Sequence, residues 1–165
     1  MPVCELAQLS GLLKAGTCLL GLDPGKKRIG VAISDPALRV ASPLTVIERG
    51  KFAADAAALA LIINERKVGG LIIGLPKSMD GSEGPPAQAA RAFARNLLRR
   101  DHLLVEDIPI VFWDERFSTA AVEREMIAHD ITRTRRAAKI DSAAAAYILQ
   151  GVLDAISGKQ MNYER

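Results

Sequence analysis

The sequence is poor in the residue types that build zinc sites, disulfide frameworks and aromatic surfaces. Its 165 residues include two cysteines, two histidines and 4% aromatic residues. Cys4 and Cys18 are too few for a disulfide framework, and no Cys or His cluster has the spacing of a zinc site. A reducing, cytoplasmic setting is therefore expected. The core must consist mostly of aliphatic side chains and alanine, and no strand is rich enough in aromatic residues to suggest base stacking.

The chain also lacks the features that mark membrane and secreted proteins. No stretch approaches the roughly 18 consecutive apolar residues of a membrane span, and residues 1–14 lack the basic start and apolar core of a secretion signal. No internal repeat or low-complexity linker divides the sequence. The length suits one domain. We place it at residues 18–157, after an N-terminal extension at 1–17 and before a tail at 158–165.

Neither sign of charge dominates. Lys and Arg number 22 against 19 Asp and Glu, which gives a net charge of +3. This mild excess is compatible with a polyanionic partner and does not prove one, so the placement of the charges matters more than their sum.

Hydrophobic patterning predicts an α/β fold with a mixed five-stranded sheet flanked by helices. Strands expected at 18–23, 28–34 and 44–48 are close enough in sequence to form an antiparallel meander. Helices from about 52 and over 87–100 then alternate with strands at 68–75 and 108–113, which implies parallel pairs with right-handed crossovers. The rest is expected to form a short helix at 5–13, a helix at 118–128, a basic loop at 132–139 and a helix at 141–157.

Three carboxylates stand at positions that this architecture brings together. Asp23 and Asp114 end two apolar strands, and ligands of open sheets bind beyond the carboxyl ends of the strands. Asp141 is one helical step before Ala145 and shares its sheet-facing side. Plainer explanations exist, because Asp23 could cap its own turn and Asp141 could cap the last helix. The apolar stripe that sets the facing direction consists of Ala145, Ile148, Leu149, Val152, Leu153 and Ile156.

Three clustered carboxylates repel one another strongly unless a cation lies among them. An all-oxygen ligand set without His or Cys favours Mg²⁺ or Mn²⁺ over zinc or copper. Two such ions, about 3.5–4 Å apart, would hold the attacking water and the leaving oxygen of a phosphodiester. The sequence therefore predicts a metal site formed by Asp23, Asp114 and Asp141.

Four segments in a fixed order carry a family resemblance. They are GLDPGKKRIGVAISD at 21–35, GLPKSMDGSEG at 74–84, DERFST at 114–119, and DSAA at 141–144 followed by ILQ at 148–150. Through them the chain resembles the YqgF family, the RuvX-like proteins of ribonuclease H-like fold. The match covers residues 18–156 roughly, and the extension at 1–17 departs from the family's usual start close to the first strand.

The resemblance implies a hydrolase, a metal-dependent nuclease acting on phosphodiester bonds. The family is described both as a Holliday-junction resolvase and as the nuclease that matures the 5′ end of the small-subunit (16S) rRNA precursor. It places catalytic acids at Asp23, at Asp114 or Glu115, and at Asp141. A non-catalytic nucleic-acid-binding or ribosome-assembly factor is the alternative, although such a protein has no need for three convergent acids. Actin-like and sugar-kinase ATPases share the Asp-x-Gly strand end but need two such domains.

Basic residues near the predicted site are candidates for nucleic-acid binding. The candidates are Lys26, Lys27, Arg28, Lys77, Arg116, Arg133, Arg135 and Arg136. Arg91, Arg95 and Arg99 also share a helix face, which is more typical of a solvated surface than of a phosphate track. RNA versus DNA and monomer versus homodimer stay open. Trp113 and Tyr147 are expected in the core.

Overall fold

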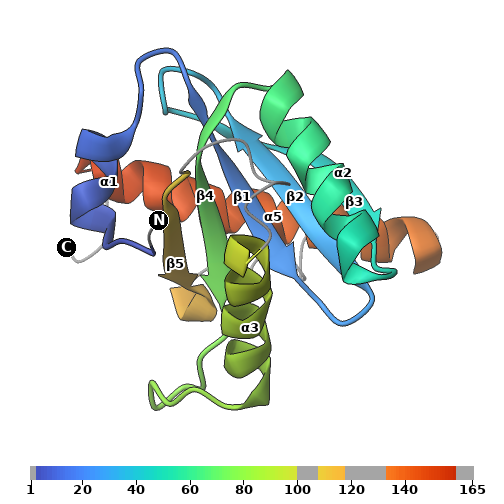
Figure 1. The fold of residues 1–165 in the computed structure, drawn as a ribbon. Helices are drawn as coiled ribbons and strands as arrows, with labels where there is room; N and C mark the ends of the chain where they lie inside the picture. The colour runs from blue at the N-terminus through green and yellow to red at the C-terminus, as the bar shows by residue number, and fades with distance from the viewer. Residues whose placement is uncertain (1–2, 100–107, 118–132, 159–165) are drawn as a thin grey trace.

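The centre of the molecule is a five-stranded sheet with the strand order β3-β2-β1-β4-β5 (Figure 1). The computed structural model describes residues 3–99, 108–117 and 133–158. The strands are β1 Cys18–Pro24, β2 Arg28–Ser34, β3 Ala41–Glu48, β4 Val68–Leu75 and β5 Ile110–Asp114. β1, β2 and β3 pair antiparallel, whereas β1, β4 and β5 pair parallel. The predicted mixed sheet is confirmed.

Helices cover both faces of this sheet. They are α1 Leu6–Leu12, α2 Phe52–Glu65, α3 Pro85–Arg99, the 3-10 turn η1 Glu115–Phe117 and α5 Arg133–Ser157. α2 and α3 lie on one face, and α5 crosses the other (Figure 1). The helix expected at 118–128 lies outside the described residues. Of the helices within the described ranges, none is both long enough and apolar enough to span a bilayer.

Both faces of the sheet are apolar because the strands alternate their side chains between two separate cores. Leu20 and Leu22 of β1 pack in the cluster that includes α2 and α3, whereas Leu19 packs in the cluster beneath α5. Asp23 has the same parity as Leu19. The alternation therefore directs its carboxylate to the α5 face.

The last helix begins earlier than the sequence predicted. Residues 133–139 were expected in a loop, and this is wrong, because α5 starts at Arg133. No Gly or Pro interrupts the chain between Arg133 and Asp141, and Arg, Ala and Lys are good helix formers. Asp141 therefore lies about two turns inside the helix, where it has no free N–H groups to cap.

The N-terminal extension is part of the packed fold. Leu9 of α1 is fully buried in the cluster beneath α5. Val3 forms a parallel bridge with Ile110, and the Cys4 backbone N–H donates to the Ile110 carbonyl at 2.9 Å. The extension thereby covers part of the β5 edge, which would otherwise expose unpaired backbone groups.

Glycines in the central strands allow α5 to lie very close to the sheet. A Cβ atom at Gly21 would come within 2.9 Å of the Leu149 Cβ, and one at Gly30 would collide with the backbone carbonyl of Asp141. Glycine inside a strand often marks such a close approach. These contacts fix where along the sheet the Asp141 backbone sits.

We expect Gly30→Ala to lower the free energy of unfolding by about 1–3 kcal/mol, because the added methyl group must push α5 away from β2. Gly50→Ala is the matched control, since nothing lies within 4 Å of its added Cβ, and its effect should stay within about 0.5 kcal/mol. Urea denaturation of both variants measures the difference. Equal stability of the two variants would contradict the close approach.

Candidate active site at the carboxyl edge of the sheet

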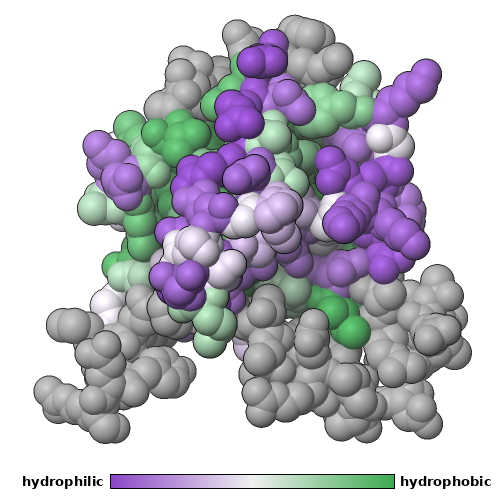
Figure 2. All heavy atoms as spheres, turned by 90° about the horizontal axis from the view of Figure 1, so that it is seen from below, coloured by the Kyte–Doolittle hydropathy of each residue, from purple (hydrophilic) through white to green (hydrophobic). Residues whose placement is uncertain are grey.

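The parallel strands β1, β4 and β5 end at the same edge of the sheet, and β1 and β5 carry Asp23 and Asp114 near their ends. Leu22 pairs with Ile73 and Leu75 pairs with Asp114, so β1, β4 and β5 end side by side. Figure 2 views the molecule from this end, and hydrophilic residues cover much of the face that it shows. The shared edge expected for Asp23 and Asp114 is present.

Two glycines flank Asp23 on the neighbouring strands. Gly30 pairs directly with Asp23 across β1 and β2, and Gly74 follows Ile73 on β4. A Cβ at Gly30 would strike the Asp141 backbone, and a Cβ at Gly74 would strike the Glu115 carboxyl. The absence of side chains at these two positions leaves room for both acids beside Asp23.

Asp23 and Glu115 form a carboxyl pair. Their side chains share a hydrogen bond, and burial, the charge of Asp23 and that hydrogen bond together raise the pKa of Glu115 to about 8. Burial also raises the pKa of Asp23, with the negative charge of Asp141 adding to the effect, while the hydrogen bond with Glu115 works the other way. At neutral pH the metal-free pair therefore holds one proton, with Glu115 donating to the Asp23 carboxylate.

Asp114 is engaged elsewhere. Its Oδ2 accepts from the Arg116 Nε at 2.8 Å and lies 2.6 Å from Nη2, while Oδ1 accepts from the Arg116 backbone N–H. Burial opposes ionisation of Asp114, but these Arg116 hydrogen bonds outweigh it and lower the pKa. Arg116 also donates to the Met79 carbonyl, which ties the loop after β4 to the same edge. Glu115, not Asp114, is therefore the acid that forms a hydrogen bond with Asp23.

The negative charge of Asp141 lies close enough to Asp23 to disfavour the ionisation of Asp23. The Asp141 carboxylate itself is paired with Arg28. The Arg28 Nε donates to the Asp141 Oδ2 at 2.7 Å. Within residues 3–99, 108–117 and 133–158, no three acidic, His or Cys side chains form a group arranged to hold a metal ion. Asp23 and Glu115 are therefore joined by a hydrogen bond, and Asp141 lies nearby with its carboxylate paired to Arg28.

The exposed cations Lys26 and Lys27 occupy the turn between β1 and β2. Arg49 braces this turn, because its Nη1 donates to the Gly25 carbonyl at 2.6 Å. The same guanidinium lies 3.9 Å from the carboxylate of Asp55, which is buried.

The other predicted cations have different surroundings. Lys77 is half-buried and helps to lower the pKa of Asp114. Arg91 pairs with Glu83 and lies over the Phe112 ring. The backbones of Arg133, Arg135 and Arg136 are in α5, and their side chains lie outside the described residues.

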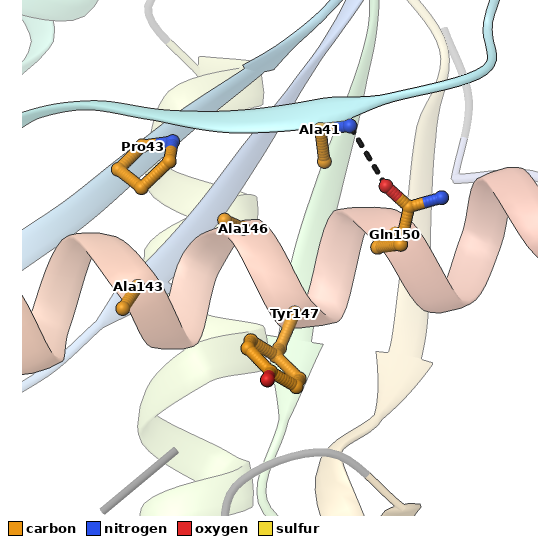
Figure 3. Close-up of a pocket in the computed structure, with 6 residues that line it drawn as sticks. All are labelled: Ala41, Pro43, Ala143, Ala146, Tyr147 and Gln150. Carbon is orange, nitrogen blue, oxygen red and sulfur yellow. Dashed lines mark hydrogen bonds between the residues drawn. The ribbon is translucent and has the colours of Figure 1, made fainter. Parts of the chain in front are cut away.

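An apolar groove of about 300 Å³ lies along the contact between β3 and α5, and the residues that line it do not include Asp23 or Glu115 (Figure 3). Tyr147 stands at its rim with 41% of its surface exposed, so its predicted core position is wrong. Gln150 closes one end by accepting from the Ala41 backbone N–H at 2.8 Å. None of the acids lines this groove. Trp113, in contrast, packs against the core beneath α5 as predicted.

The strand order, the mixed pairing and the acids at the carboxyl edge define an α/β protein of ribonuclease H-like fold. A family model described as "RuvX: Holliday junction resolvase" matches residues 17–155. The chain belongs to the RuvX family.

Curated relatives match over nearly the whole chain. A protein of Paracoccus denitrificans (strain Pd 1222) is 58% identical over 153 residues, which cover 92% of this chain and 94% of that protein. One of Roseobacter denitrificans is 53% identical over 152 residues, 92% of this chain and 91% of that protein. One of Caulobacter sp. (strain K31) is 51% identical over 159 residues, 96% of this chain and 94% of that protein, and so includes most of the first 17 residues. All three are named "Putative pre-16S rRNA nuclease".

Among solved structures, T. thermophilus RuvC in complex with a Holliday junction substrate aligns with a TM-score of 0.49 and 12% identity, covering 86% of this chain and 96% of that chain. The family assignment is carried by the sequence matches.

The carboxyl pair predicts a stability that falls with rising pH in metal-free protein. The pKa of Glu115 rises on folding from an ordinary 4.5 to about 8, so between these values the folded state binds more protons than the unfolded state. This proton contributes its full stabilisation to the free energy of unfolding below pH 4.5. That contribution decreases above pH 4.5 and is lost as the pH rises through about 8.

We expect urea denaturation in chelator-containing buffers to show this loss in the wild type. Glu115→Gln should flatten the profile, whereas Glu83→Gln, at a surface ion pair, should leave its slope nearly unchanged. A Glu115→Gln profile as steep as that of the wild type would show that the pair does not hold the proton.

Proposed function

We propose that this chain is a metal-dependent nuclease that hydrolyses phosphodiester bonds, with the 16S rRNA precursor as its substrate. The observation that carries this proposal is the half-buried Asp23–Glu115 pair, with Asp141 beside it, at the carboxyl edge of the sheet. Relatives at 51–58% identity named as pre-16S rRNA nucleases support the substrate. They are not named as ATPases, which leaves that alternative without support.

The acids fit a divalent cation. A cation stabilises two half-buried carboxyls that share one proton at neutral pH, because its positive charge replaces that proton. Oxygen-only donors suit Mg²⁺ or Mn²⁺. Asp23, Glu115 and Asp141 would hold the ion, with Asp114 positioned by Arg116 next to them. A bound divalent ion would supply an activated water and neutralise charge that develops on the phosphate.

The chain's own cations would position the nucleic acid. Lys26 and Lys27 are exposed in the braced turn directly after Asp23, where they can hold phosphates on either side of the scissile bond. Lys77 and Arg116 line the same edge beside Asp114. Arg133, Arg135 and Arg136, at the start of α5, are proposed to extend this basic surface.

A non-catalytic binding factor explains the acids less well. A carboxyl with a pKa raised to about 8 by burial and neighbouring charge makes the metal-free fold less stable at neutral pH. Strained or repulsive arrangements of this kind persist where function requires them. Cleavage of branched DNA is the alternative activity, because the matching family model is described as a Holliday junction resolvase.

Cleavage assays on a 5′-extended 16S rRNA fragment and on a four-way DNA junction, each with Mg²⁺ or Mn²⁺, test the proposal. We expect metal-dependent cleavage of the RNA, reduced about 100-fold or more in Asp23→Asn. Asp35→Asn is the matched control, because Asp35 accepts hydrogen bonds from Arg39 and Val40 in a surface turn, and it should retain activity.

Cleavage of the junction alone would assign the resolvase activity instead. Equal activity of Asp23→Asn and the wild type would place the catalytic centre elsewhere. Binding of both nucleic acids without cleavage would favour the assembly-factor alternative.

A further inference from the structure

The ion pair between Arg28 and Asp141 joins two parts of the chain that are far apart in sequence. Arg28 begins β2 and Asp141 lies in α5, and their side chains meet at 2.7 Å. The two side chains are 26% and 29% exposed. Because both are partly hydrated, the pair can open at a modest cost in free energy.

The Asp141 backbone packs closely against β2, so the direction of its carboxylate depends on the side-chain torsions. Its carbonyl is packed against Gly30, the residue that pairs with Asp23. The Asp141 charge already acts on Asp23, yet the described residues contain no group of three acids arranged to hold a metal. A change of the Asp141 side chain from Arg28 towards Asp23 would bring the third acid to the pair.

Arg28 has a second partner available in the proposed reaction. A guanidinium donates two parallel hydrogen bonds to a phosphate as readily as to a carboxylate. Arg28 directly follows the exposed Lys26 and Lys27, so a phosphodiester bound by that turn would reach its guanidinium. Phosphate and Asp141 would then compete for the same donor.

We infer that Arg28 is a positioning residue that couples nucleic-acid binding to metal binding. Without nucleic acid it holds the Asp141 carboxylate and competes with the cation. When a backbone phosphate takes the guanidinium, Asp141 is released to complete the site with Asp23 and Glu115. The inference rests on the proposed nuclease function. It adds that the metal site is fully formed only when substrate is bound, which restricts activated water to the complex.

Such coupling is reciprocal. If the nucleic acid raises the affinity for the metal by some factor, the metal raises the affinity for the nucleic acid by the same factor. The inference therefore predicts a binding linkage that can be measured without any turnover.

Calorimetric titration with Mn²⁺ tests the linkage, in the absence and presence of a short phosphorothioate RNA whose intact length is checked after each run. In the wild type the RNA should tighten Mn²⁺ binding by about fivefold or more. Arg28→Gln should bind Mn²⁺ more tightly than the wild type without RNA, and adding RNA should change its affinity by less than about twofold.

Arg66→Gln is the matched control. It removes one exposed positive charge beside Cys18, at the opposite end of β1 from Asp23, and the Arg28–Asp141 pair remains. We expect this variant to keep the RNA-dependent tightening. If Arg28→Gln does not fold, Arg28→Lys replaces it, because it keeps the charge and removes the Nε–H that contacts Asp141, and it should weaken the linkage in the same direction.

Two results would overturn the inference: Arg28→Gln binding Mn²⁺ no more tightly than the wild type without RNA, or RNA tightening Mn²⁺ binding in that variant as it does in the wild type. Failure of the nuclease proposal would appear in the cleavage assays and is therefore distinguishable from these two binding results. A wild type that shows the linkage but cleaves neither substrate refutes the proposed activity and leaves the linkage in place.

Discussion

Two missing side chains, at Gly30 and Gly74, set the geometry on which the site depends. These glycines flank Asp23 on the neighbouring strands, and the Asp141 backbone and the Glu115 carboxyl occupy the space that their Cβ atoms would need. Any larger residue would push α5 or η1 away from Asp23. The sheet therefore holds Asp23 on β1, and the glycines on the two neighbouring strands allow Asp141 and Glu115 to lie close to it.

Bringing acids together in this way opposes folding, and the surrounding structure offsets the cost. One proton is shared within the Asp23–Glu115 pair, and the two remaining acids, Asp114 and Asp141, are each matched with an arginine. Burial of apolar side chains in the cores on the two faces of the sheet offsets the repulsion among the acids at its carboxyl edge. The metal-free site is thus charge-balanced by groups that a cation and a phosphate can replace.

Much of this arrangement follows from local sequence signals. Apolar runs predict the strands, and the i, i+3, i+4 stripe of α5 predicts the side of the helix on which Asp141 lies. Strand glycines were a further available signal for close approach at Gly30 and Gly74. Other features depend on tertiary contacts that no local pattern encodes. The turn of η1 brings Glu115 to Asp23, and the Arg28–Asp141 pair spans 113 positions.

The central claim is that a divalent cation replaces the proton held by the Asp23–Glu115 pair. Titration of Mn²⁺ at neutral pH in two buffers of different ionisation enthalpy measures the protons released on binding. Because the pKa of Glu115 is raised to about 8, the account predicts that close to one proton leaves per bound ion in the wild type and none in Glu115→Gln. Mn²⁺ binding without proton release in the wild type, or equal release in the variant, would contradict it.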